Sequence, residues 1–92
     1  MRVTLHLPSP LRTFASGQGV LTLTGATTVA EALALAPVGV RDRILDERGA
    51  LRLHVNVFVG ETSVRETGGL ETPLGDGARV LVIPAISGGL AG

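Results

Sequence analysis

From position 3 to position 7, valine and leucine alternate with threonine and histidine. This period of two predicts a strand with one buried face, and Pro8 ends the strand because proline cannot donate a backbone hydrogen bond. A second apolar stretch over residues 20–24 follows a Gly-Gln-Gly turn sequence. The two stretches predict an antiparallel hairpin whose connection is too long for a tight turn.

A helix is predicted to begin after Thr28. The sequence Thr-Val-Ala-Glu that ends at Glu31 fits a capping box, in which the Thr28 hydroxyl accepts a hydrogen bond from the Glu31 amide and the Glu31 carboxylate accepts one from the Thr28 amide. Alanine-rich helix formers follow, and Pro37 with Gly39 is expected to end the helix. Residues 40–48 have apolar positions at helical spacing among charged ones, which predicts a short second helix or a turn.

The second half of the chain has the pattern of returning strands. The strongest strand pattern covers residues 53–59, where Leu53 falls on one face with three valines and Phe58 falls on the other face. A short strand is expected over residues 62–65. The continuous apolar run within residues 79–84 predicts a strand in the middle of the sheet.

This order of elements predicts an α+β domain with the ubiquitin-like β-grasp arrangement, in which one main helix lies across a mixed sheet. We expect the β-grasp domain to span residues 1–84. Residues 85–92 contain three glycines and no periodicity, which predicts a flexible Gly-Gly C-terminal tail. A ferredoxin-like domain is the alternative, although that fold has a second full helix.

The composition excludes several classes of function. The 92 residues have room for a single domain. Eight arginines balance eight acidic residues, lysine is absent and aromatic residues make up 2%, so the chain lacks the positive charge and stacking side chains of a nucleic-acid-binding domain. Without cysteine there are no disulfides and no thiolate metal sites. No apolar run approaches the roughly 18 residues of a membrane span and no signal-peptide pattern opens the chain, so we expect a cytoplasmic protein with no membrane partner.

The predicted domain contains no recognisable catalytic cluster. His6 and His54 fall on the polar phases of their strands, where we interpret them as surface residues rather than metal ligands. Phe58 is either a core residue beneath the helix or an exposed aromatic in a docking patch. The tail is the remaining candidate, because Gly88 and Gly89 have no Cβ and therefore let the backbone thread a narrow channel.

Five segments of the sequence resemble a known family when they are taken together. They are Val3-Thr4-Leu5-His6-Leu7-Pro8 with Leu11-Arg12, His54-Val55-Asn56-Val57-Phe58-Val59, Val64-Arg65-Glu66-Thr67-Gly68-Gly69-Leu70, Leu74-Gly75-Asp76-Gly77 and Val82-Ile83-Pro84-Ala85-Ile86-Ser87-Gly88-Gly89. Through these segments the chain resembles the ThiS/MoaD family of ubiquitin-like sulfur carriers. The resemblance is strongest to the branch that supplies sulfur for cysteine biosynthesis.

The resemblance implies a chemistry centred on one carboxylate. An E1-like adenylating enzyme (MoeB/ThiF-type) would use ATP to activate Gly89, and a sulfur donor would convert the adenylate to a thiocarboxylate. Gly88, Ser87 and Ile86 would form the rest of the tail, and Phe58, if exposed, would belong to the patch that docks the adenylating enzyme. The chain itself would be a carrier rather than an enzyme and would bind no metal or cofactor.

The resemblance also implies further partners. In the cysteine branch, a PLP-dependent cysteine synthase would consume the thiocarboxylate, and a JAMM-type metalloprotease would release the product. Three alternatives remain open. One is the small subunit of molybdopterin synthase, whose partner is the large subunit, and another is a ubiquitin-like protein modifier. The third is a plain β-grasp interaction module with no reactive tail.

The end of the sequence departs from the family pattern. Family members usually end at Gly-Gly, whereas Leu90, Ala91 and Gly92 follow Gly89 here, so Gly89 has no free carboxylate. We expect a partner metalloprotease to cut between Gly89 and Leu90. An inactive paralogue is the alternative.

Overall fold

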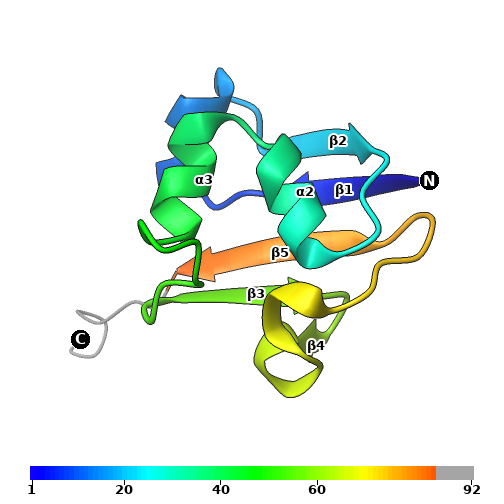
Figure 1. The fold of residues 1–92 in the computed structure, drawn as a ribbon. Coiled ribbons are helices and arrows are strands. Elements are labelled where there is room, and N and C mark those ends of the chain that lie inside the picture. Colours follow the sequence, from blue (N-terminus) through cyan, green and yellow to red (C-terminus); the bar gives the residue numbers. More distant parts are fainter. Residues whose placement is uncertain (85–92) are drawn as a thin grey trace.

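The computed structural model describes residues 1–84, which form a five-stranded mixed sheet in the order β2-β1-β5-β3-β4 (Figure 1). β1 (Arg2–His6) and β2 (Val20–Thr24) form the predicted antiparallel hairpin. The apolar positions of β1 are buried and face the helices, while its threonine and histidine lie on the opposite face, as the alternation predicts.

The sheet is completed by three strands from the second half of the chain. β5 (Arg79–Pro84) lies parallel to β1 on one side and antiparallel to β3 (Val55–Val59) on the other. β4 (Thr62–Ser63) pairs with the outer edge of β3. The predicted central position of the last strand is therefore confirmed.

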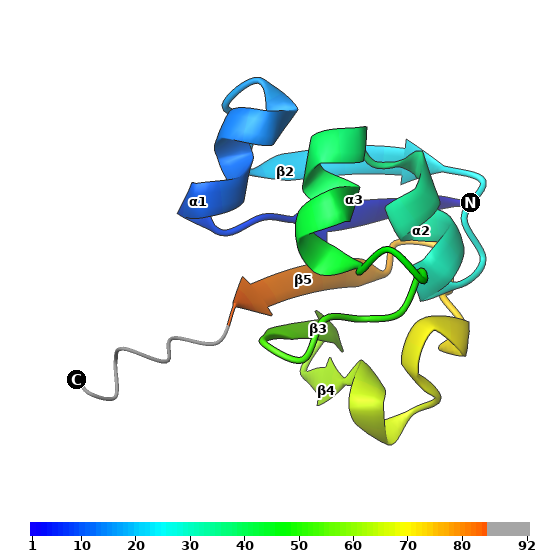
Figure 2. The same cartoon turned by 60° about the vertical axis from the view of Figure 1, so that its left-hand side comes forward.

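Two helices of seven residues each, α2 (Val29–Leu35) and α3 (Val38–Ile44), cover one face of the sheet (Figures 1 and 2). α2 is the predicted main helix. The predicted short second helix or turn over residues 40–48 is α3, which begins at Val38 and ends at Ile44. Pro37, expected to end the first helix, is the N-cap residue of α3, and Gly39, also expected to end that helix, lies inside the first turn of α3. Glycine at position 39 lets α3 pack closely against Phe14, because a Cβ there would come within 2.9 Å of Cδ1 of Phe14.

The start of α2 is capped by threonines. The Thr28 Oγ1 accepts a hydrogen bond from the Glu31 amide at 3.2 Å, as predicted. The Glu31 Oε1, however, accepts from both the amide and the hydroxyl of Thr27, each at 2.7 Å, rather than from the amide of Thr28. The hydroxyl bond, followed by the amide bond, holds the pKa of Glu31 below its ordinary value.

The connection between β1 and β2 is helical rather than irregular. It consists of α1 (Ser9–Arg12) and a turn of 3₁₀ helix, η1 (Thr13–Ala15). The Arg12 Nε donates to the Leu7 carbonyl oxygen at 3.1 Å, which ties the connection back to the end of β1. Figure 2 shows this segment beside α3.

Two further turns of 3₁₀ helix lie between β4 and β5. The predicted strand over residues 62–65 stops at Ser63, because the Ser63 hydroxyl accepts a hydrogen bond from the Arg65 amide at 3.3 Å and begins η2 (Val64–Glu66). η3 (Gly69–Glu71) follows. The glycine before η3 has φ of 112°, a conformation that residues with a Cβ rarely adopt.

The core between the helices and the sheet is aliphatic. Leu5 of β1, Leu33 of α2 and Ile44 of α3 are its largest fully buried side chains, and Val57 and Val80 contribute from β3 and β5. Within residues 1–84, no helix is long and apolar enough to cross a lipid bilayer.

Candidate functional site

The segment that carries the predicted chemistry leaves from the middle of the sheet. β5 ends at Pro84, and hydrogen-bonded neighbours hold the strand on both sides. The predicted tail residues Ile86, Ser87, Gly88 and Gly89, with the expected processing position at Leu90, lie outside the described residues. The structure therefore fixes the point from which the tail departs.

Phe58 lies on the face of the sheet that the helices leave uncovered. It is directly opposite Leu81 of β5 in the antiparallel register, whereas its neighbour Val57 faces the helices and is fully buried. Ile83, two residues along β5 from Leu81, is 46% exposed. Of the two interpretations of Phe58, the core position beneath the helix is excluded. Phe58, Leu81 and Ile83 form an apolar strip, which we call the open-face patch.

Leu53 does not take the position that its alternation predicts. The Val55 amide donates to the Arg52 carbonyl oxygen at 3.2 Å, and this turn delays the start of β3 until Val55. Leu53 is consequently 87% exposed instead of facing the core. The sequence pattern misses this residue because a turn can preserve apparent alternation without continuing the strand.

Two hollows meet beside the end of β5. One has a volume of about 390 Å³ and extends toward Phe58 and Ile83, and the other has a volume of about 460 Å³ and extends toward Arg43 and Arg52. Both are lined by Leu53 and Pro84 together with His54 and Val55. The point from which the tail departs is therefore flanked by concave surface on two sides.

Three arginines surround this point, and a defined contact holds each of them. The Arg65 Nη2 donates to the carbonyl oxygens of Arg52 at 3.1 Å and Val55 at 2.7 Å. The Arg52 Nε donates to the Asp42 carbonyl oxygen at 3.1 Å. The guanidinium carbon of Arg43 lies 4.7 Å from the centre of the Phe14 ring, a cation–π contact.

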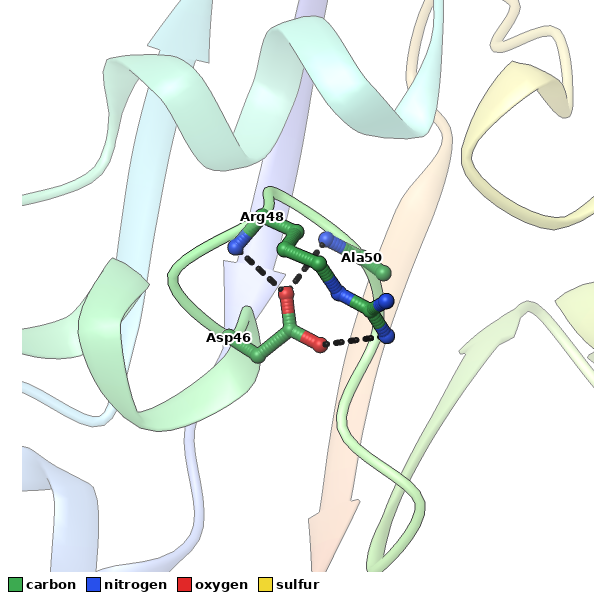
Figure 3. Close-up of polar contacts among 3 residues, drawn as sticks. All are labelled: Asp46, Arg48 and Ala50. Atoms are coloured by element: carbon green, nitrogen blue, oxygen red, sulfur yellow. Dashed lines mark hydrogen bonds and ion pairs between the residues drawn. The ribbon is translucent and has the colours of Figure 1, made fainter.

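The carboxylate of Asp46 lies near the point from which the tail departs, which we call the tail exit, and it accepts hydrogen bonds from the backbone. Figure 3 shows the Asp46 Oδ1 accepting hydrogen bonds from the amides of Arg48 at 2.9 Å and Ala50 at 3.0 Å. The Asp46 Oδ2 lies 3.9 Å from a guanidinium nitrogen of Arg48. The Ala50 bond is the main cause that lowers the pKa of Asp46. The carboxylate thus closes the loop between α3 and β3.

The two histidines do not form a metal site. The His6 Nε2 lies 3.0 Å from the Thr4 hydroxyl on the open face, and His54 is exposed beside Leu53. In the part of the chain that the structure describes, no three His, Asp or Glu side chains come close enough together to hold a metal ion.

The sequence has relatives of known type. A model of the ThiS family matches residues 5–89. The sulfur carrier protein CysO of Mycobacterium tuberculosis is 36% identical over 93 residues, which cover 97% of this chain and 100% of that protein. The protein of the same name from Mycobacterium bovis matches with the same identity and coverage.

The fold is shared with solved structures. The crystal structure of Mycobacterium tuberculosis CysO superposes with a TM-score of 0.82 at 30% identity and covers 91% of this chain and 99% of its own. CysO in the BexX/CysO complex of Amycolatopsis orientalis gives 0.81 at 31% identity, with 91% and 96% covered. SAMP1 from Haloferax volcanii gives 0.80 at 22% identity, with 96% and 99% covered, and shows the fold alone. The predicted β-grasp fold is confirmed.

Proposed function

The chain belongs to the ThiS family, and we propose that it is a sulfur carrier whose reactive group is the carboxylate of Gly89, freed by removal of residues 90–92. The observation that carries this proposal is the end of the family match at Gly89, five positions after β5 ends at Pro84. Five extended residues span about 17 Å, enough for the end of the chain to enter a partner's buried site while the domain stays outside.

The proposed reaction begins with an E1-like adenylating enzyme. A carboxylate oxygen of Gly89 attacks the α-phosphorus of ATP and pyrophosphate leaves, which converts an unreactive carboxylate into an electrophilic acyl adenylate. A sulfur donor then adds sulfur to the acyl carbon, and AMP leaves with the electron pair of the broken carbon–oxygen bond. The resulting thiocarboxylate is a nucleophile. In this scheme the β-grasp domain is a carrier and the catalysis belongs to its partners.

We further propose that the sulfur goes to cysteine biosynthesis, with a PLP-dependent cysteine synthase as the acceptor enzyme. A JAMM-type metalloprotease would first remove Leu90–Gly92 and later release cysteine from the tail. Because adenylation consumes ATP, we assign the whole cycle to the cytoplasm. The resemblance to carriers of the cysteine branch supports this assignment over molybdopterin synthesis and protein modification.

We propose the open-face patch as the surface that docks the adenylating enzyme. Phe58 and Leu81 are neighbours across β3 and β5, and Ile83 continues the apolar strip toward Pro84. An apolar strip that leads to the start of the tail suits a partner that must hold the domain and receive the tail at the same time.

The proposal is tested with three purified forms of the chain, ending at Gly88, Gly89 and Gly92. Each is incubated with the adenylating enzyme, ATP and a sulfide source, and its intact mass is then measured. We expect only the form ending at Gly89 to gain the mass of sulfur in place of one oxygen. Sulfur on the form ending at Gly92, with none on the form ending at Gly89, would refute the assignment.

A second measurement tests the processing step in the cell. Intact mass of the protein recovered from its own cells should include a species that ends at Gly89 and carries sulfur. Recovery of sulfur-bearing protein that retains Leu90, Ala91 and Gly92 would contradict the proposed trimming.

A further inference from the structure

Leu53 is an exposed apolar side chain that contributes little to the core of the domain. It is the most exposed large hydrophobic side chain among residues 1–84, at 87%. One exposed leucine is ordinary on a protein surface. This one, however, lines both hollows at the tail exit together with Pro84, the last described residue of β5.

The loop that carries Leu53 is held in place. The Arg65 guanidinium bonds to the carbonyl oxygens of Arg52 and Val55, on either side of Leu53. The Arg52 amide donates to the Ile44 carbonyl oxygen at 3.0 Å. Because ordering a loop costs conformational entropy at the moment of binding, a loop that is ordered in advance loses less of it. Leu53 is therefore presented on a rigid support.

The charge beside Leu53 is positive. Arg43 and Arg52 line the hollow of about 460 Å³, and Asp46 is the acidic residue that lines it with them. The Asp46 carboxylate is already engaged by two backbone amides and by Arg48. Asp42 and Glu47 line a different hollow with the same two arginines, and Pro84 does not border that hollow.

We propose that Arg43, Arg52, Leu53 and Pro84, which we call the tail-exit collar, dock against the mouth of the channel through which the adenylating partner receives the tail. The mouth presents acidic side chains to the two arginines and an apolar socket to Leu53. This inference rests on the proposed function and adds a second contact surface to the open-face patch.

The position of the collar supports this occupant. A partner that takes up the tail has to approach Pro84, where the described chain ends. Leu53 borders the same two hollows as Pro84, and Arg43 and Arg52 border one of them. Opposite charges across a contact raise the association rate and select the partner. An acidic mouth therefore fits a cationic rim on a chain whose net charge is zero.

The test measures adenylation by isotope exchange between pyrophosphate and ATP, with the chain ending at Gly89 as the carrier. We expect the double variant Arg43→Glu/Arg52→Glu to raise KM about 10- to 100-fold with kcat little changed, because charge reversal slows encounter. The KM of the unaltered carrier should rise with added NaCl, and the double variant should lose most of this dependence. Leu53→Ser should raise KM about tenfold.

Arg2→Glu is the control for the single reversals Arg43→Glu and Arg52→Glu, because it makes the same charge change as each of them at the start of β1, at the opposite end of the sheet from Pro84 (Figure 1). We expect its KM to equal that of the unaltered carrier. The variant Arg43→Gln/Arg52→Gln keeps most of the side-chain length and should give an intermediate KM. Thermal midpoints of all variants show whether an effect on KM comes from misfolding.

Three results would overturn the proposal. The first is an unchanged KM in the double charge reversal, and the second is an equal increase in Arg2→Glu. The third is a dimer in sedimentation analysis that the double reversal abolishes without changing KM, since the collar would then cover a second copy of this chain. A carrier that is never adenylated refutes the proposed function instead, so the two failures are distinguishable.

Discussion

Gly39 of α3 packs directly against the ring of Phe14. A Cβ at position 39 would lie 2.9 Å from Cδ1 and 3.1 Å from Cβ of Phe14. The Arg43 guanidinium, one helical turn further along, covers the same ring. This contact joins α3 to the connection between β1 and β2.

The first prediction concerns this close approach. Gly39→Ala should lower stability to urea, because overpacking costs about 1–3 kcal/mol and outweighs the gain in helix propensity of roughly 1 kcal/mol. In a Phe14→Ala background the same substitution should cost less, since Cδ1 and Cγ of the ring, which lie 2.9 and 3.3 Å from the added Cβ, are gone. Equal costs in the two backgrounds would contradict the packing argument.

The second prediction compares two leucines under the same substitution. Leu33→Ala should cost about 2–5 kcal/mol of unfolding free energy, because Leu33 is fully buried between α2 and the sheet. Leu53→Ala should change it by less than about 0.5 kcal/mol, since the side chain is 87% exposed. Urea titration measures both. A large cost at Leu53 would mean that it packs in solution.

The third prediction separates docking from stability on the open face. Phe58→Ser should weaken binding to the adenylating enzyme at least tenfold, measured by calorimetry, because a half-buried aromatic leaves the patch. Loss of the cross-strand contact with Leu81 should cost only about 0.2–1 kcal/mol of stability. Val20→Ser, on β2 of the same face, is the control and should bind normally. Equal losses in both variants would argue against a patch centred on Phe58.

The fourth prediction follows from the lowered pKa of Glu31. Its folded pKa lies below the ordinary 4.5 because of the bonds from Thr27, so the ionised carboxylate stabilises the fold above pH 4.5. This contribution is lost as the pH falls from 4.5 through the folded pKa. Glu31→Gln should therefore lower Tm at neutral pH, and the difference from the unaltered chain should shrink with acidification.

Glu61→Gln is the control for that measurement, because it removes an exposed carboxylate from the turn between β3 and β4. Its Tm should follow that of the unaltered chain across the acid range. A Glu31 difference that stays constant down to the pH at which the carboxylate is protonated would show that Thr27 does not hold the ionised form.

The strands were predictable because period-two alternation directly reports one buried face. The sequence places Val57 and Phe58 on opposite faces of β3, but it contains no signal for which face the helices cover, so the exposure of Phe58 required the structure. The exposure of Leu53 also required it, since the turn at Arg52 leaves the alternation intact.

The helix boundaries were less predictable because glycine can either end a helix or allow close packing inside one. A glycine after a helical pattern usually indicates the end of a helix. Gly39 instead lies inside α3, where the ring of Phe14 leaves no room for a Cβ. Phe14 is 25 positions earlier in the sequence. A contact over that distance has no local signature. The hydrogen bond that caps α2 at Thr28 was predicted correctly. The Glu31 carboxylate bonds to Thr27 rather than to the Thr28 amide, because its partner depends on the path of the chain into the helix.

β5 lies between β1 and β3, and this position determines how the domain responds to a force on its C-terminal end. Force applied at Pro84 along the strand direction loads the hydrogen bonds to β1 on one flank and to β3 on the other, and these bonds run across the pull rather than along it. They have to break together instead of opening one after another. A pull on the end of β5 is therefore opposed by two strand pairings at once.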